Sequence, residues 1–187
     1  MTTKVINFDK PKDGQKIDNF YGDVTFASIT TNPPKRWRTF ARQTTDPDTA
    51  PNTVDVKRTG FVGFDATLGG VEATFRRPQR YVSIRAKPYV IDEPIGQQPL
   101  GRPFVEFYSA KGGKVPNSVL MTRNYYPFFF WQQGWGTWQT IAYQSLDIGK
   151  IIFSSTYSLP HVWSLFDTLI YADTIPDFQN IQLGPPA

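Results

Sequence analysis

The clearest strand of the sequence is the run Arg80-Tyr81-Val82-Ser83-Ile84-Arg85-Ala86-Lys87. Apolar and polar residues alternate along it, which is the period-two pattern of a strand that buries one face. The pattern predicts that Val82, Ile84 and Ala86 face a core, and that Ser83, Arg85 and Lys87 face water. A strand with one buried face needs a second layer to cover that face, so this run indicates a packed β domain.

The same alternation recurs along the chain, and no stretch of about twelve residues carries the apolar stripe of a helix. Gly, Pro or Asp ends most runs, so we expect many short strands, few helices and hairpin turns at Gly69-Gly70 and Gly112-Gly113. Residues 31–53 are expected to form a long irregular excursion. The predicted fold is an all-β antiparallel β-sandwich. Further strands are predicted at residues 4–8, 23–27, 54–56, 59–64, 71–75, 104–108, 115–122, 138–143, 150–154 and 164–172.

The composition supports a β-rich fold and excludes several kinds of site. The chain has 187 residues, with 15 Phe, 9 Tyr, 5 Trp, 16 Pro and 14 Gly. This length suits one domain over residues 1–187, with residues 174–187 predicted as a C-terminal extension or tail. The absence of cysteine excludes disulfides, thiolate nucleophiles and cysteine-ligated metals, and the single histidine, His161, excludes a multi-histidine site.

The charge indicates no specialised partner. The formal net charge is +4, from 20 basic and 16 acidic residues. The densest basic segments, residues 35–38 and 76–80, are short and interrupted, so we expect no nucleic acid partner. No apolar run approaches the roughly 20 residues that span a bilayer, so no membrane insertion is expected. The compartment stays open, with an extracellular one favoured.

Two end segments resemble a known family. Residues Val5-Ile6-Asn7-Phe8-Asp9, followed by Tyr21-Gly22, resemble the opening of bacterial galactose-binding-like jelly-roll domains. The segment from Trp163 to Tyr171 resembles their final strand, while the middle of the chain fits in order only. Residues 31–53 and 123–136 have no counterpart. The resemblance implies a jelly-roll β-sandwich of the carbohydrate-binding-module type, with its first and last strands close together.

The resemblance also implies that these two strands share a structural calcium ion in some members. Asp9 and Asp167 are the two residues carried over as metal ligands, and carbonyl groups of residues 12–18 would complete the 6–8 oxygens that calcium prefers. The usual acidic pair is here Asp167-Thr168, so one expected carboxylate is missing. The alternative is that Asp9 caps a turn and that Asp167 accepts hydrogen bonds from buried amides.

The sharpest local feature is an aromatic segment, in which eight of the fifteen residues from Asn124 to Trp138 are aromatic. Sugar-binding sites combine flat aromatic rings with amide and guanidinium groups, because a sugar ring has a C–H face and a hydroxyl rim. The segment therefore predicts a carbohydrate-binding loop, with Trp37 of the early excursion as a second platform. The predicted ligand-binding residues are Trp131, Trp135, Tyr126, Gln132, Gln133, Arg123, Asn124 and Trp37.

Other interpretations stay open beside this one. The aromatic residues could instead plug one end of the sandwich, which we expect for residues 128–130 and for Trp138. They could also contact another protein or a second copy of the chain, as in an interaction or assembly module. No catalytic activity is expected, since no nucleophile elbow occurs and glycoside hydrolysis needs two neighbouring carboxyl groups. Glu72, Glu106 and Asp65 are available, but alternation gives no reason to bring them together.

Overall fold

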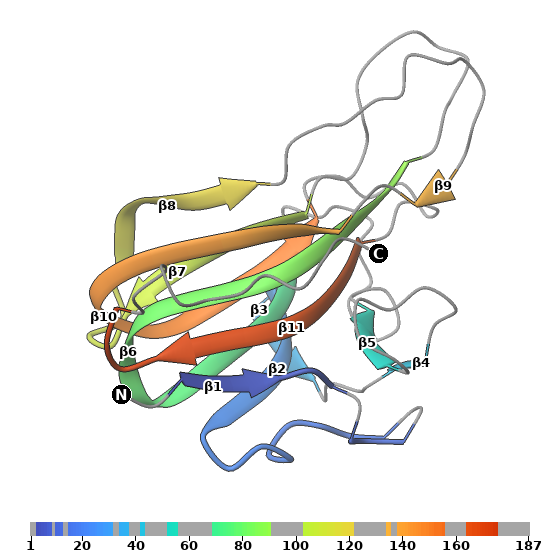
Figure 1. The fold of residues 1–187 in the computed structure, drawn as a ribbon, viewed down its shortest axis with the longest axis horizontal. Helices are drawn as coiled ribbons and strands as arrows, with labels where there is room; N and C mark the ends of the chain where they lie inside the picture. The colour runs from blue at the N-terminus through green and yellow to red at the C-terminus, as the bar shows by residue number, and fades with distance from the viewer. Residues whose placement is uncertain are drawn as a thin grey trace, which may run out of the picture.

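The computed structural model describes residues 3–8, 10–12, 15–31, 34–37, 42–43, 52–55, 69–90, 103–121, 134–135, 138–155 and 164–175. Every regular element of this part is a β-strand, and every strand pair is antiparallel (Figure 1). The predicted all-β antiparallel fold is confirmed. The strands are β1 Thr3–Ile6, β2 Val24–Thr31, β3 Pro34–Trp37, β4 Arg42–Gln43, β5 Asn52–Asp55, β6 Gly69–Val90, β7 Pro103–Ser109, β8 Lys114–Met121, β9 Gly134–Trp135, β10 Gln139–Ser155 and β11 Ser164–Ala172.

The sandwich is built around two long strands, β6 and β10, which pair with each other along most of their length and contribute to both layers (Figure 1). The first layer places the C-terminal half of β6 beside β11, which in turn pairs with β1 and β5. The second layer places the N-terminal half of β6 beside β2, and the C-terminal half of β10 beside β7 and then β8. Both layers are therefore continuations of one pair of strands.

The two strands change layers at irregular positions rather than at turns. The β6–β10 register shifts between Gln144 and Ile148 and again between Ile148 and Lys150. Such bulges bend a strand and change which residues face the core. In β6 the core positions accordingly switch from Val71, Ala73 and Phe75 to Val82, Ile84 and Ala86. The sequence prediction of separate strands at 71–75 and 80–87, and at 138–143 and 150–154, is wrong because each strand continues through the bend that interrupts its pattern.

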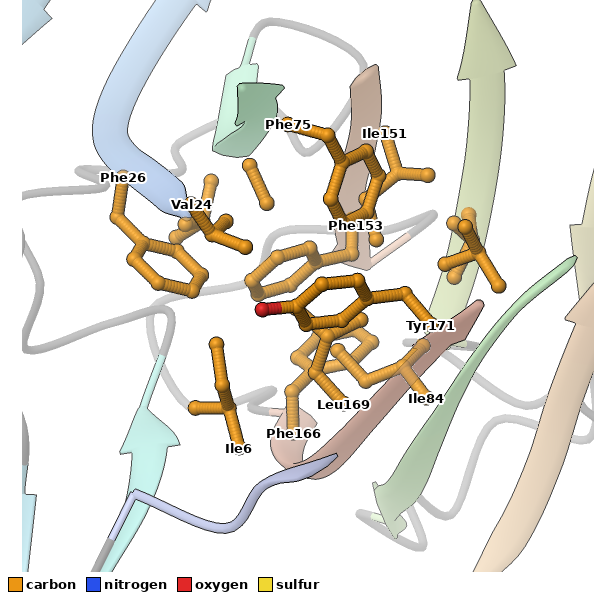
Figure 2. Packing of buried hydrophobic residues seen from close by; sticks show 14 of the residues in the cluster. Ile6, Val24, Phe26, Phe75, Ile84, Ile151, Phe153, Phe166, Leu169 and Tyr171 are labelled. Atoms are coloured by element: carbon orange, nitrogen blue, oxygen red, sulfur yellow. The ribbon is translucent and has the colours of Figure 1, made fainter. Parts of the chain in front are cut away.

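The core lies between the two layers, and aromatic contacts cross it. Phe153 of β10 meets Phe166 of β11 with ring centroids 4.8 Å apart, and Phe75 meets Tyr171 at 5.2 Å. Figure 2 shows labelled side chains from both layers pointing toward one another. Burying these large rings supplies the main stabilisation of the sandwich, since each removes about 150–250 Å² from water.

Several sequence predictions can be compared with these elements. The last strand, Ser164–Ala172, has the predicted bounds, and β1 pairs with it as the family resemblance implied. The Gly112-Gly113 turn is confirmed by hydrogen bonds between Ser109 and these two glycines. Gly69-Gly70 is not a turn, because these residues begin β6 and pair with β2. The irregular excursion contains the short strands β3, β4 and β5, and the predicted strand at 59–64 lies outside the described residues, as do residues 176–187.

The outer face of β6 corrects a second prediction. Val82, Ile84 and Ala86 are fully buried as expected, but Ser83 and Lys87 are also buried, at 2% and 7% exposure. Only Arg85 of the three polar residues is half-buried, where its Nη1 donates to Thr140 Oγ1 at 3.0 Å. Alternation reports which side of a strand a residue occupies, but not whether another segment covers that side.

Candidate functional site

The strand order brings polar residues from three strands to the outward face of the second layer. Ile152 of β10 pairs with Glu72 of β6 on one side and with Glu106 of β7 on the other. Directly opposite residues of neighbouring strands lie on the same face of a sheet, so both glutamates flank Ile152. Two interstrand spacings put their Cα atoms about 10 Å apart. The next row contains Thr74, Lys150 and Tyr108.

Hydrogen bonds and charge contacts join these side chains into one group, which we call the two-glutamate cluster: Glu72, Thr74, Glu106, Tyr108, Lys114 and Lys150. Lys150 Nζ donates to Glu72 Oε2 at 3.0 Å and lies 5.0 Å from the centre of the Tyr108 ring. The Tyr108 hydroxyl donates to Glu106 Oε2 at 2.7 Å, and Lys114 Nζ contacts Glu106 Oε1 at 2.5 Å. Thr74 Oγ1 donates to Glu72 Oε1 at 3.2 Å.

The cluster opens toward solvent from Glu72 to Lys114. The side-chain exposed fraction is 6% for Glu72, 21% for Glu106, 31% for Lys150 and 44% for Lys114. Burial first, and then the hydrogen bond and negative charge of Glu106, raise the pKa of Tyr108, so that its hydroxyl keeps its proton. Glu72 therefore anchors Lys150 from below, while Lys150, Tyr108, Glu106 and Lys114 present the accessible groups.

A buried hydroxyl on the same face has an unused hydrogen-bonding capacity. Ser154 lies two residues after Ile152 on β10, pairs with Phe104 of β7 and is fully buried. Its Oγ has no hydrogen-bond partner in the described part of the chain. Buried hydroxyls are nearly always paired, so an orphaned one marks a place where a water or ligand group is expected.

The arrangement offers both hydrogen-bond donors and hydrogen-bond acceptors. A carboxylate has about four acceptor sites, so Glu106 retains capacity beyond the contacts above. Glycoside hydrolysis requires one of two carboxyl groups to donate a proton to the leaving oxygen. Here both glutamates accept hydrogen bonds from lysine ammonium groups. The cluster thus offers acceptors, cationic donors and an aromatic side chain in one place.

The aromatic segment lies mostly beyond what the structure describes. The predicted residues Arg123, Asn124, Tyr126, Trp131, Gln132 and Gln133 are outside the described residues. Trp135 belongs to β9, which pairs with the end of β6 through Tyr89 and Val90, and Trp37 of β3 pairs with Ser28. Trp138 is half-buried, with the Lys87 ammonium 5.8 Å from its ring. The assignment of these residues to a sugar site stays a prediction.

The structure describes one of the two predicted calcium ligands. Asp9 lies outside the described residues, whereas Asp167 is fully buried and its Oδ1 accepts the backbone amide of Thr168 at 2.7 Å. This contact is the amide-binding role that the sequence left as the alternative. Among the residues that the structure describes, no three acidic or histidine side chains group as a metal site, and no helix is long and apolar enough to cross a membrane.

The two-glutamate cluster was missed by the sequence interpretation, although Glu72 and Glu106 had been considered for hydrolysis. Alternation gives no reason to bring them together, and strand order does so, because β10 lies between their strands and Ile152 pairs with both. The signal was present in part. The polar positions of the predicted strands include Glu72, Glu106, Tyr108 and Lys150. The strand order that aligns them cannot be inferred from the sequence of any one strand.

No protein-family model and no curated protein matches the chain. Among solved structures, the chain is similar to the K2 cleaved adhesin domain of Lys-gingipain, with 9% identity, a TM-score of 0.48, and 91% of this chain and 99% of that chain covered. It is similar to the CBM22-1 xylan-binding domain from Paenibacillus barcinonensis Xyn10C, with 11% identity, a TM-score of 0.42, and 92% and 95% covered.

A third similar structure is the K1 cleaved adhesin domain of Lys-gingipain from Porphyromonas gingivalis W83. The identity is 12%, the TM-score is 0.39, and 94% of this chain and 100% of that chain are covered. At identities of 9–12%, these likenesses say nothing about individual site residues. The resemblance to galactose-binding-like domains stays a prediction at the level of the family.

Proposed function

We propose that the chain is a non-catalytic carbohydrate-binding domain, of the lectin or carbohydrate-binding-module type, and that the two-glutamate cluster contacts the ligand. A sugar offers hydroxyl groups that donate and accept hydrogen bonds around an apolar C–H surface. The cluster provides carboxylate acceptors, ammonium donors and a tyrosine side chain within two rows of one sheet face. The observation that carries the proposal is this alignment of Glu106, Tyr108 and Lys150, each half-buried and held by a neighbour.

The absence of catalysis is part of the proposal. A general acid or base must exchange its proton with the substrate near neutral pH. The two carboxylates that could exchange a proton, Glu72 and Glu106, accept hydrogen bonds from Lys150 and Lys114. The pKa of Tyr108 is raised, which disfavours this residue as a base. We therefore expect no release of reducing sugar from any polysaccharide that the chain binds.

A glycan array followed by calorimetric titration of the best ligand tests the function. Tyr108→Ala should weaken binding at least tenfold, since it removes the ring and the hydroxyl that holds Glu106. Tyr143→Phe is the matched control, because Tyr143 packs against Phe107 on the core side and its hydroxyl donates to Pro116 O. Binding that survives Tyr108→Ala unchanged would place the site elsewhere.

We keep the aromatic segment as a second proposed contact region. Indole rings beside glutamine amides suit stacking on a sugar face. Trp131→Ala and Trp135→Ala test it in the same titration. If each weakens binding together with Tyr108→Ala, both regions contact the ligand, whereas unchanged binding in both tryptophan variants removes the segment from the site.

We also propose a structural calcium ion where β1 and β11 meet. The register pairs Ile6 with Leu169, so the residues after β1 continue beside the β11 bulge that contains Asp167. Phe8 and Thr168 both adopt positive φ, at 55° and 45°, a strained conformation for such residues that often marks a functional position. A buried carboxylate suits a cation, and calcium takes carboxylate and carbonyl oxygens.

The carboxylate of Asp167, and that of Asp9 as implied by the resemblance, would hold the ion and rigidify the junction. Thermal unfolding with calcium, with chelator and with magnesium tests it. A bound ion should raise the melting temperature in calcium alone, by an amount that grows with its concentration. Equal melting temperatures in calcium and chelator would remove the ion and leave the amide-binding role of Asp167.

A further inference from the structure

One row of residues crosses five neighbouring strands on the face of the two-glutamate cluster. Directly opposite residues of paired strands share a face of the sheet. The strand registers therefore align one residue from each of β2, β6, β10, β7 and β8, and four interstrand spacings give this alignment a length of about 19 Å. We call it the five-strand row: Thr25, Thr74, Lys150, Tyr108 and Lys114.

Every side chain of the five-strand row has a hydrogen-bonding group and reaches solvent. Thr25 and Lys114 at the two ends are exposed, and the three residues between them are half-buried. A hydroxyl group both donates and accepts, and an ammonium group has several N–H donors. Lys150 thus keeps donors beyond its hydrogen bond to Glu72. The row offers hydrogen-bonding groups at each step from β2 to β8.

Along the middle strand, β10, the same face does not stay open. Toward the end of β10, Ile152 is half-buried and Ser154 is fully buried. In the opposite direction the register shifts between Ile148 and Lys150, and Ile148 belongs to the core. Across the strands, by contrast, the row is accessible from one end to the other. A long ligand therefore finds accessible polar groups across the strands and not along β10.

Resting on the carbohydrate-binding function proposed above, we infer that the cluster binds an internal stretch of a linear polysaccharide, which crosses the strands along the five-strand row. The length of the row exceeds that of a single sugar ring, so a monosaccharide fills only part of it. Because Thr25 and Lys114 are both exposed, the polymer can continue past either end. The inference adds Thr25 of β2 as a contact residue outside the two-glutamate cluster.

Calorimetric titration with a chain-length series tests the inference. The series runs from the monosaccharide to the hexasaccharide of the best polysaccharide on the array, followed by the polymer itself. The dissociation constant should fall at least about tenfold from disaccharide to hexasaccharide, because the longer ligand contacts more of the row. One long polymer should bind more than one copy of the protein, whereas a site for one kind of chain end would bind a single copy per linear chain.

A variant at the far end of the row tests the direction of the ligand. Thr25→Val removes a hydroxyl and keeps the branched shape that suits a strand. It should weaken hexasaccharide binding about three- to tenfold and leave disaccharide binding unchanged, because only the longer ligand reaches β2. Thr3→Val is the matched control, since Thr3 is an exposed strand residue of the other layer, and it should change neither affinity.

The outcomes separate the inference from the proposed function. Equal affinities for disaccharide and hexasaccharide, with Tyr108→Ala weakening both, overturn the inference and keep the carbohydrate function. A single protein bound per polymer chain does the same, because it indicates recognition of a chain end. Length-dependent binding that is unchanged by Thr25→Val refutes the path along the row. Failure of every glycan to show a Tyr108-sensitive component overturns the proposed function, and the inference with it.

Discussion

Replacing Lys150 with methionine should destabilise the chain more than the same change at Lys114. Both lysines contact a glutamate on one sheet face, but the side chains of Glu72 and Lys150 are 6% and 31% exposed, against 21% and 44% for Glu106 and Lys114. Methionine keeps the apolar stem of lysine and removes the charge. The comparison therefore isolates the effect of burial on an ion pair.

The expected cost of Lys150→Met follows from how deeply the Glu72–Lys150 pair is buried, between the limits of a fully buried and a fully exposed ion pair. Breaking a fully buried pair costs about 3–5 kcal/mol, and an exposed pair contributes about 0.2–1 kcal/mol. Lys150 is nearly one-third exposed and Glu72 keeps the Thr74 hydroxyl at 3.2 Å, so we expect Lys150→Met to cost about 1.5–3 kcal/mol. Lys114→Met should cost less than about 1 kcal/mol, because Glu106 keeps the Tyr108 hydroxyl and more solvent.

Urea unfolding at pH 7 measures both changes from the shift in midpoint at constant slope. Glu72→Gln should cost less than Lys150→Met, since Lys150 without its carboxylate can extend into water, whereas the charged Glu72 stays buried. The double variant should give a coupling energy of at least about 1 kcal/mol. Equal costs for Lys150→Met and Lys114→Met, or no coupling with Glu72→Gln, would show that Glu72 is solvated. The conclusion that the cluster is closed to solvent at Glu72 would then be wrong.

Two other changes test the packing of the sandwich and the linkage of stability to pH. Gly149→Ala should lower the free energy of unfolding in urea by about 1–3 kcal/mol, because a Cβ at residue 149 would lie 2.4 Å from the Ala110 Cα. Gly22→Ala is the control, because a Cβ there would have nothing within 4 Å. Similar unfolding midpoints for the two variants would contradict the close approach of Gly149 to Ala110. Burial, and secondarily the charge of Asp23, raise the pKa of Tyr171 to about 12, so its contribution to stability is complete below the unfolded pKa near 10 and is lost as pH rises toward 12. Wild type should lose up to about 3 kcal/mol in that window, and Tyr171→Phe should lose less; identical alkaline profiles would refute the shift.

The sequence predicted individual strands well because each carries its own pattern. The last strand has its predicted bounds, Ser164–Ala172, and the core positions Val82, Ile84 and Ala86 follow from alternation. Ser83 and Lys87 were assigned to water because alternation cannot report a covering segment. The continuity of β6 through residues 76–79 was missed because Arg76, Arg77 and Pro78 resemble a turn.

The candidate site also depends on strand order, which the pattern of a single strand does not report. Glu72 and Glu106 are separated by 34 positions in sequence, and nothing near either residue indicates the other. They share a face only because β10 enters between β6 and β7, which is a property of strand order. An aromatic loop has a local signature, whereas a polar group assembled across four strands has none.

The sharing of β6 and β10 between both layers has a consequence for how the chain folds. Their pairing joins residues about 53 to 82 positions apart, from Gln139 with Ala86 to Phe153 with Val71, so this step closes a long loop and should be slow. Once the β6–β10 pair has formed, however, it is part of both sheets, and neither sheet can be completed while the other is missing. We therefore expect a single kinetic barrier and one cooperative transition, with no populated species that retains only half of the sandwich.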